Sequence, residues 1–387
     1  MMAEEIRNHL EQKILPFWEK LADQRYGGYY GYVDKELRIQ PEADKGCILN
    51  SRILWTFSAA ARELEKPELR AFADRAYDFL HCFEDPENGG VFWSVTHDGK
   101  PADTTKHTYC QAFTIYGLAA YYQLTGKQEA LDKAMDLFRL IETRCRDAGG
   151  YFEALKADFS PESNEKLSEN GVMASRTMNT LLHVAEAYAE LQRACPDPEV
   201  RSAGRSCLER FLHTFYNPEK HRLEVFCDDQ YRPMLDMQSY GHDIEASWLL
   251  WDAVKTFLPE AEWAPYRAMC LDLAESICER AFTEHGLRNE CVDGVNDELR
   301  IWWVQAETML GLENAWELTG DPVWLDRLKT QWDSLKRLIV DKRADGEWYW
   351  SVYEDGTLTE RPMVEEWKCP YHNGRMCIRL IKAGLPV

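Results

Sequence analysis

The stretch Asn88-Gly89-Gly90-Val91-Phe92-Trp93 is one copy of a turn-and-strand element that recurs through the whole chain. Its glycines suit a tight turn, and the aromatic and β-branched residues after them suit a short strand. Further copies lie at residues 25–31, 148–153, 220–226, 285–290 and 345–350. Their spacing of roughly 60–70 residues is typical of a repeat architecture, in which each unit packs against the next.

Two helical segments accompany each copy of this element. The first kind carries apolar residues at three- and four-residue steps with charges between them, which predicts amphipathic helices with one solvated face. These segments are residues 5–21, 68–83, 128–144, 199–215, 263–282 and 322–340. The second kind is apolar on most sides, which is typical of buried helices. These segments are residues 48–64, 107–124, 172–191, 242–257, 301–318 and 371–383.

Six such pairs arranged in a ring predict an all-α (α/α)6 barrel. Its six inner helices would surround the axis, its six outer helices would cover them, and short β-hairpins would lie at one end. We expect residues 1–387 to form a single closed domain, because the pairs number six and little chain is left over. An open helical solenoid is the alternative arrangement of the same pairs.

The composition narrows the classes of function. A net charge of -21 at pH 7 disfavours binding to nucleic acid or to an anionic membrane surface, because both attract clustered Lys and Arg. No apolar run approaches the length of a membrane span, and the N-terminus has no secretory signal pattern. The 12 cysteines include no Cys-x-x-Cys pair, which indicates free thiols in a reducing compartment. We therefore expect a monomeric, cytoplasmic protein that acts on a small molecule.

Polar or reactive residues recur near the start of each inner segment. In a closed ring these equivalent positions converge on one end of the axis and can form one pocket. They are Arg52, Tyr109, Gln111, Asn179, His183, His242, Glu245, Trp303, Glu307 and His372. Imidazoles titrate near neutral pH, so several of them in a shared pocket predict acid–base chemistry. Glu245, three residues after His242 on the same helix face, could hold that imidazole or bind a hydroxyl.

Each of these residues also has a structural explanation. A histidine can be a satisfied core residue, Arg52 can be a buried ion-pair partner, and the many aromatic rings can simply fill the core. The remaining histidines of the outer segments and strands are expected at the surface. They are His9, His81, His97, His213, His221 and His285.

A metal centre is not expected, because no His-x-x-x-His pair or His/Cys cluster has ligand spacing. A nucleotide cofactor is not expected either. The tripeptide Asp98-Gly99-Lys100 is followed by Pro101 rather than Ser or Thr, and no glycine-rich phosphate loop precedes it.

Four stretches of the sequence resemble the N-acylglucosamine 2-epimerase superfamily and, within it, the cellobiose 2-epimerases. They are residues 45–55 (KGCILNSRILW), 176–183 (RTMNTLLH), 239–248 (SYGHDIEASW) and 366–375 (EWKCPYHNGR). The resemblance spans essentially the full length and implies the same (α/α)6 barrel. Asn50 is one departure, because some relatives have histidine there, but it should not disturb Arg52.

The resemblance implies epimerisation at C2 of the reducing-end glucose of β-1,4-linked disaccharides. Cellobiose would become 4-O-β-glucosyl-mannose, and lactose would become epilactose. The resemblance also implies roles for individual residues. His242 would assist ring opening and closing, His372 would exchange the C2 proton, His183 would be a third essential histidine, and Arg52 would stabilise the enediolate oxygen. Substrate binding would involve Tyr109, Asn179, Glu245, Trp248, Trp303, Glu307 and Trp367, with the tryptophans at 303 and 367 stacking on sugar.

The residue types suit this chemistry. Once the hemiacetal opens, a base can remove the C2 proton beside the carbonyl, and a cation at the carbonyl oxygen lowers the barrier. One histidine or two could handle that proton, and no cofactor is needed because no net redox change occurs. Three alternatives remain: another sugar isomerase of the superfamily (an N-acylglucosamine 2-epimerase or mannose isomerase), a glycoside hydrolase using Glu245 and Glu307, and a non-catalytic sugar-binding barrel.

Overall fold

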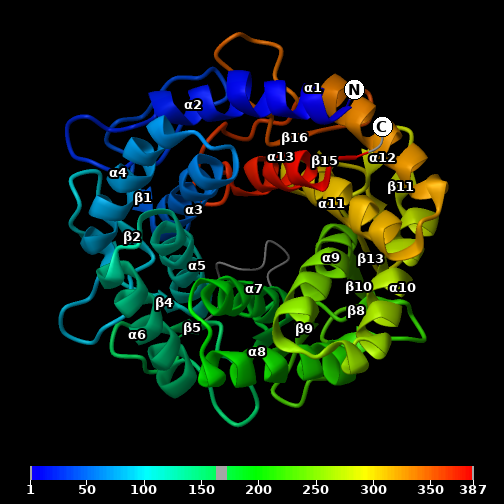
Figure 1. The fold of residues 1–387 in the computed structure, drawn as a ribbon, viewed down its shortest axis with the longest axis horizontal. Coiled ribbons are helices and arrows are strands. Elements are labelled where there is room, and N and C mark those ends of the chain that lie inside the picture. Colours follow the sequence, from blue (N-terminus) through cyan, green and yellow to red (C-terminus); the bar gives the residue numbers. More distant parts are fainter. Residues whose placement is uncertain (1, 163–171, 386–387) are drawn as a thin grey trace.

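The computed structural model describes residues 2–162 and 172–385, and within these ranges the helices form two concentric rings around one axis (Figure 1). The inner ring consists of α3 (Cys47–Glu63), α5 (Thr108–Thr125), α7 (Met178–Ala194), α9 (Tyr240–Phe257), α11 (Trp302–Thr319) and α13 (Tyr371–Ala383). The outer ring consists of α1 (Met2–His9), α2 (Leu15–Lys20), α4 (Arg70–Leu80), α6 (Gln128–Arg144), α8 (Pro198–Arg210), α10 (Ala264–Arg280) and α12 (Pro322–Leu338). The first two are joined by a π-helical turn at Leu10–Ile14, so they act as one outer helix. The predicted all-α (α/α)6 barrel is therefore confirmed.

The inner ring is closed. Each inner helix packs against the next one along the chain, from α3 to α13, and α13 packs against α3. The first outer helix, α1, also packs against α13, so the two ends of the chain lie close together (Figure 1). This closure excludes the open solenoid that the repeat alone would permit.

Short antiparallel strands join neighbouring repeats at the end of the barrel where the inner helices begin. The pairs are β1 (Lys45–Gly46) with β2 (Ser94–Val95), β2 with β3 (Pro101–Asp103), β4 (Lys106–His107) with β5 (Ala154–Leu155), β6 (Arg176–Thr177) with β9 (Phe226–Cys227), β7 (Tyr216–Asn217) with β8 (Arg222–Leu223), β10 (Met237–Ser239) with β13 (Glu290–Val292), β13 with β14 (Val295–Asp297), β11 (Phe282–Thr283) with β12 (Gly286–Leu287), and β15 (Arg300–Ile301) with β16 (Ser351–Val352). In the first pair Lys45 lies opposite Val95. The turn glycines adopt left-handed backbone conformations, with φ of 79° at Gly89 and 73° at Gly90. The hairpins predicted from the repeated element are therefore confirmed.

The third inner helix begins later than the apolar pattern indicates. The sequence predicts its start at residue 172, whereas α7 begins at Met178. The two residues before it form β6, which pairs with Phe226–Cys227, and the hydroxyl of Thr177 accepts a hydrogen bond from the backbone of Thr180 (3.2 Å). This N-cap and the strand pairing fix the start of the helix. The pairing partner is distant in sequence, so the local pattern does not reveal it.

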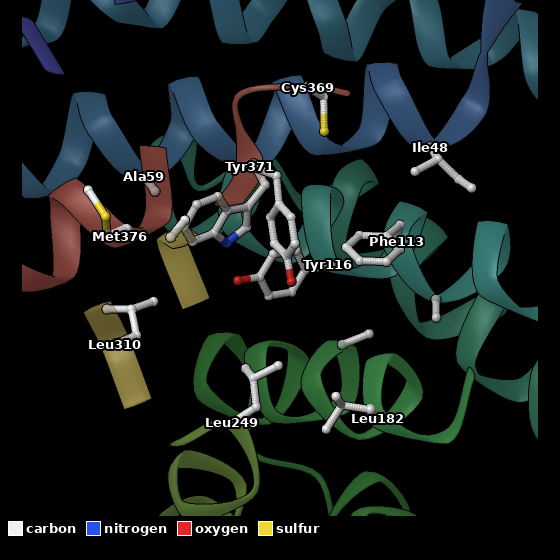
Figure 2. Packing of buried hydrophobic residues seen from close by; sticks show 14 of the residues in the cluster. Ile48, Ala59, Phe113, Tyr116, Leu182, Leu249, Leu310, Cys369, Tyr371 and Met376 are labelled. Carbon is white, nitrogen blue, oxygen red and sulfur yellow. The ribbon is translucent and has the colours of Figure 1, made fainter. Parts of the chain in front are cut away.

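The core lies between and within the two rings. Every side chain of α5 from Thr108 to Tyr121 is buried, as expected for a helix that is apolar all round. Figure 2 shows side chains from neighbouring inner helices meeting in one cluster, in which the rings of Tyr116 and Tyr371 cross edge to face with centroids 5.8 Å apart. All 12 cysteines lie in the described part of the chain and are free thiols. The prediction of unpaired cysteines is therefore confirmed.

The prediction that His9 lies at the surface is wrong. Its ring lies between the rings of Trp332 and Trp348, with centroids 5.8 and 5.9 Å away, and its Nε2 accepts a hydrogen bond from Nε1 of Trp348 (2.6 Å). The contact closes the seam between the first outer helix and the last repeat. Burial lowers the pKa of His9 to about 4.

We predict that His9 makes the fold sensitive to acid. Below about pH 6.5 an unfolded histidine binds a proton, whereas the folded one stays neutral down to about pH 4, so stability falls as the pH falls through this window. The shift corresponds to a loss of roughly 2–3 kcal/mol between pH 7 and pH 4. In His9→Gln, which keeps an acceptor for Trp348 but does not titrate, urea unfolding at pH 7 and pH 4.5 should show a smaller difference than in the wild type. An equal difference in the two proteins would contradict the prediction.

Candidate active site

The first turn of α9 fixes His242. Ser239 is the N-cap of this helix, and its hydroxyl lies 2.7 Å from Nδ1 of His242. Gly241 allows α11 to approach closely, since a Cβ at this position would lie 2.5 Å from the ring of Trp303. As a result the half-buried His242 packs against Trp303, with ring centroids 4.8 Å apart. The expectation that Glu245 holds this imidazole is wrong, because Ser239 does so.

His372 is the second residue of α13 and also packs against Trp303. The two ring centroids are 5.7 Å apart, so one tryptophan contacts both histidines. Nδ1 of His372 lies 2.7 Å from Oε1 of Glu307 on α11. Its Nε2 makes no hydrogen bond to any residue in the described ranges. That nitrogen is therefore available to a ligand.

His183 belongs to the same cluster. Its Nδ1 lies 2.8 Å from Oε2 of Glu186, one turn further along α7, and its ring packs against that of Tyr109 (5.0 Å). Its Nε2 lies 4.0 Å from Glu245, and Nδ1 of His372 lies 3.9 Å from the same carboxylate. Three histidines predicted from separate repeats therefore lie around one site.

Arg52 is a buried cation at this site. Its Nη2 donates to the hydroxyl of Tyr109 (2.8 Å), and its guanidinium is flanked by the rings of Phe113 (4.1 Å) and Tyr371 (4.6 Å). Within residues 2–162 and 172–385 no carboxylate forms an ion pair with it. A buried charge without a counter-charge is costly, which indicates that the position is kept for an anionic group. Asn50 instead donates to the backbone of its own helix, at the carbonyl of residue 46 (3.0 Å), and leaves Arg52 undisturbed.

The candidate residues divide into a half-buried rim and a buried floor. The half-buried residues are Asn179, His242, Trp303 and Trp367. The buried residues are Arg52, Tyr109, His183, Glu245, Trp248, Glu307 and His372. Trp248 donates from Nε1 to Glu307 (2.9 Å), so its polar atom faces a protein group. The rim can contact a ligand directly, whereas Glu245, Trp248 and Glu307 contact the histidines and one another.

Gln111 does not belong to the site, and its prediction as an axis-facing residue is wrong. Its amide bonds to both the backbone nitrogen and the backbone carbonyl of Val91, each at 2.8 Å. Gln305 binds Leu287 in the same way in a later repeat (3.1 and 2.9 Å). These glutamines anchor the inner helices to the strands, on the side away from the histidines.

The electrostatics keep all three histidines neutral. Burial lowers the pKa of His242 to about 3. Burial lowers the pKa of His372 well below its usual value, with Arg52 and Arg375 contributing, and it also lowers the pKa of His183. Neutral imidazoles can accept protons, so the site can perform general base catalysis at neutral pH.

A cation site was not expected, but three donors meet here. One ligand atom from each of Glu245, Glu307 and His372 lies within 4.8 Å of the others. However, Nη2 of Arg375 lies 3.1 Å from Glu245 and 2.7 Å from Glu307. The guanidinium thus fills the place that a metal ion would take, and the donor set does not fit a metal while Arg375 stays there.

Arg375, like Ser239 and Glu186, is a polar residue at this site that was not among the candidates from the sequence. It follows Tyr371 by one helical turn, and the two side chains bond to each other and to Glu186. Its position at the end of the stretch 366–375 could have revealed it, because a buried arginine needs acidic partners.

No helix in the described ranges is long and apolar enough to cross a membrane.

Comparisons with known proteins agree with this fold. A sugar epimerase from a ruminal bacterium matches with a TM-score of 0.98 and 42% identity over 100% of both chains. The cellobiose 2-epimerase of Bacillus thermoamylovorans B4167 matches with a TM-score of 0.96 and 42% identity, covering 98% of this chain and 99% of that one. The protein is therefore a carbohydrate epimerase, an isomerase-class enzyme.

The sequence profile of the family described as N-acylglucosamine 2-epimerase (GlcNAc 2-epimerase) matches residues 28–373. The cellobiose 2-epimerase of Eubacterium cellulosolvens is 46% identical over 100% of both chains. The chain belongs to the N-acylglucosamine 2-epimerase family, as the four sequence stretches indicate.

Proposed function

We propose that this enzyme inverts C2 of the reducing-end glucose of β-1,4-linked disaccharides, converting cellobiose to 4-O-β-glucosyl-mannose and lactose to epilactose. The relatives named as cellobiose 2-epimerases support this substrate class. One observation carries the chemistry: Arg52 offers a guanidinium without an ion pair, among the described residues, beside three neutral histidines. We further propose that residues 1–387 act as one domain and as a monomer, without a metal or cofactor.

Ring opening is the first step and is assigned to His242. A proton must leave O1 of the sugar and another must reach O5. The Ser239 hydroxyl, 2.7 Å from Nδ1, orients this half-buried ring and leaves Nε2 for the sugar. Trp303 and Trp367 offer half-buried ring faces on which a pyranose can stack.

Proton abstraction at C2 is assigned to His372. Glu307 accepts the Nδ1 proton of the ring, so Nε2 is the basic nitrogen. Arg52 stabilises the negative charge that develops on the carbonyl oxygen as the enediolate forms. Tyr109 bonds to Arg52 and fixes the guanidinium, and Asn179 binds a sugar hydroxyl.

Return of the proton to the opposite face of C2 completes the inversion. Either His183 delivers it, or the enediolate rotates about C2–C3 and His372 performs both transfers. Nε2 of His183 and Nδ1 of His372 lie 4.0 and 3.9 Å from the carboxylate of Glu245, so both rings lie at one site, and solvent exchange at C2 distinguishes the two routes. Glu245, Glu307 and Trp248 act by holding these groups.

A glycoside hydrolase is disfavoured by the burial of its candidate carboxylates. Glu245 is 1% exposed and Glu307 is 0% exposed. Glu307 also accepts hydrogen bonds from Trp248, His372 and Arg375, which leaves it engaged on the protein side. Hydrolysis needs one carboxyl group on each side of the glycosidic bond, with access to it.

Incubation with cellobiose in D2O, followed by NMR, tests the proposal. We expect mannose signals to appear with deuterium at C2, because the abstracted proton exchanges with solvent. Retention of some original hydrogen at C2 of the product would favour a single base, whereas complete exchange favours two. Release of free glucose would instead indicate a hydrolase. Turnover of N-acetylglucosamine or mannose, but not of cellobiose or lactose, would contradict the assigned substrate class.

A further inference from the structure

Arg375 lies beneath the histidines, and its guanidinium joins three inner helices. It is 1% exposed. Nη1 donates to Glu186 of α7, and Nη2 donates to Glu245 of α9 (3.1 Å) and to Glu307 of α11 (2.7 Å). One cation from α13 therefore binds the carboxylates of three other helices.

Two of these carboxylates hold histidines. Glu186 lies 2.8 Å from Nδ1 of His183, and Glu307 lies 2.7 Å from Nδ1 of His372. An ionised carboxylate can only accept hydrogen bonds, so each ring must place its proton on Nδ1 and leave Nε2 basic. A protonated carboxyl group could donate to Nδ1 instead, and the ring proton would then lie on Nε2. The useful tautomer of each histidine thus depends on the charge of its glutamate.

The charge of Arg375 opposes protonation of these glutamates. Burial alone raises the pKa of Glu186, but the charge of Arg375 and the hydrogen bond from His183 hold that pKa at about 2. Burial also raises the pKa of Glu307, and Arg375 counteracts this rise. Burial and the neighbouring Glu307 raise the pKa of Glu245 well above its usual value. Without the guanidinium, the three buried carboxyl groups would lose the cation that they share.

We propose that Arg375 is a positioning residue, which keeps Glu186 and Glu307 ionised and so keeps Nε2 of His183 and His372 free to accept protons. The proposal rests on the proposed function, because it concerns the nitrogens assigned to proton transfer at the sugar. Arg375 is buried beneath the histidines and sets their tautomers through the glutamates, while its charge also lowers the pKa of His372 directly.

Other titratable and charged groups also face His372 from the elements around it. They are Arg52 on α3, His183 and Glu186 on α7, Glu245 on α9, Glu307 on α11, and Tyr371 and Arg375 on α13. A substitution at Arg375 leaves all the other groups in place. A change in the pH profile of the variant therefore reports the loss of this charge.

Two variants test the proposal through their pH profiles. Arg375→Gln removes the charge, so we expect the acidic limb of kcat/KM for cellobiose to move to higher pH. Arg375→Lys keeps the charge, but one ammonium group cannot reach all three carboxylates. We expect its acidic limb to stay in place while kcat falls about 10- to 100-fold, as is usual when a group behind a catalytic ligand is lost. KM should change little in both variants.

Arg379→Gln is the matched control. Arg379 lies one turn further along α13 and stacks on Trp248 at 4.6 Å, as Arg375 does, but its ion pair is with Asp252 (3.2 Å). Its pH profile should match that of the wild type. If Arg375 were only structural, Arg375→Gln would lose thermal stability and keep the wild-type acidic limb. That result would overturn the proposal.

A measurement on the wild-type protein covers the case in which neither variant folds. 15N NMR of histidine-labelled enzyme at pH 7 reports the tautomer of each ring. We expect His183 and His372 to be neutral with the proton on Nδ1, and a proton on Nε2 of either ring would overturn the proposal. Failure of the proposed function would look different, because the wild-type enzyme would then form no glucosyl-mannose from cellobiose.

Discussion

His372→Ala is expected to lower kcat for cellobiose epimerisation by about 10²- to 10⁴-fold, the usual contribution of a positioned general base. Alanine removes the nitrogen assigned to the C2 proton and leaves Arg52 and the stacking tryptophans in place. Exchange of the C2 hydrogen with D2O, followed by NMR, should fall by the same factor. Catalysed interconversion of the sugar anomers should persist, because ring opening is assigned to His242.

The fold should survive this change. Glu307 loses the imidazole but keeps its hydrogen bonds to Trp248 (2.9 Å) and Arg375 (2.7 Å), so no buried carboxylate is left without partners. His213→Ala, at an exposed histidine of an outer segment, is the control and should retain full activity. His242→Ala should lose both anomer interconversion and C2 exchange, because opening precedes abstraction. Turnover of His372→Ala within tenfold of the wild type would remove its assignment.

The repeated turn-and-strand element and the helical spacing of apolar residues predict most of this fold, because both patterns involve residues close together in the sequence. A turn such as Gly89-Gly90, or an apolar stripe along one helix, is readable from adjacent residues. The start of α7 cannot be predicted from adjacent residues, because it depends on pairing between Arg176–Thr177 and Phe226–Cys227. The packing of His9 cannot be predicted from adjacent residues either, because its partner Trp348 comes from the opposite end of the chain.

Equivalent positions in the repeats predict the residues of the candidate site, but they do not predict the buried charges that hold those residues. Arg52, His183, His242 and His372 fall near the starts of inner helices, and ring closure brings them together. Arg375 lies three residues after His372 on α13, where the sequence pattern predicts only a buried face. Its role becomes visible only once three glutamates from different helices surround it.

Buried ion pairs just before the inner helices are a second feature that the sequence does not reveal. A cation precedes several inner helices by two residues and binds a carboxylate that follows the preceding outer helix. Lys45 pairs with Asp23 (2.7 Å), and Lys106 pairs with Asp85 (2.9 Å), all of them buried. Such pairs join consecutive elements of one repeat, so they hold the outer and inner helices of that repeat together. The sequence shows the charges but not that they are buried.

Arg52→Lys is expected to lower kcat/KM by about 10²- to 10³-fold, the usual cost of losing one donor to a developing oxyanion. The guanidinium can bond to Tyr109 through Nη2 and to the carbonyl of Trp367 through Nη1 (3.4 Å), and its planar fork carries further N–H groups for the enediolate. An ammonium group is a point charge on a flexible chain and cannot do both. It would also sit between the rings of Phe113 and Tyr371, where burial lowers the pKa of a lysine and favours its uncharged form.

Arg62→Lys supplies the matched control for this substitution. Arg62 lies on the same helix, α3, but contacts Glu63 and Gln123 near its far end. The same exchange there should leave kcat/KM for cellobiose unchanged. If both variants melt at the wild-type temperature and only Arg52→Lys is impaired, the loss reports the geometry of the guanidinium at the reacting oxygen. If Arg52→Lys retains kcat/KM within threefold of the wild type, a positive charge alone suffices, and stabilisation of the enediolate by a fixed pair of donors is wrong.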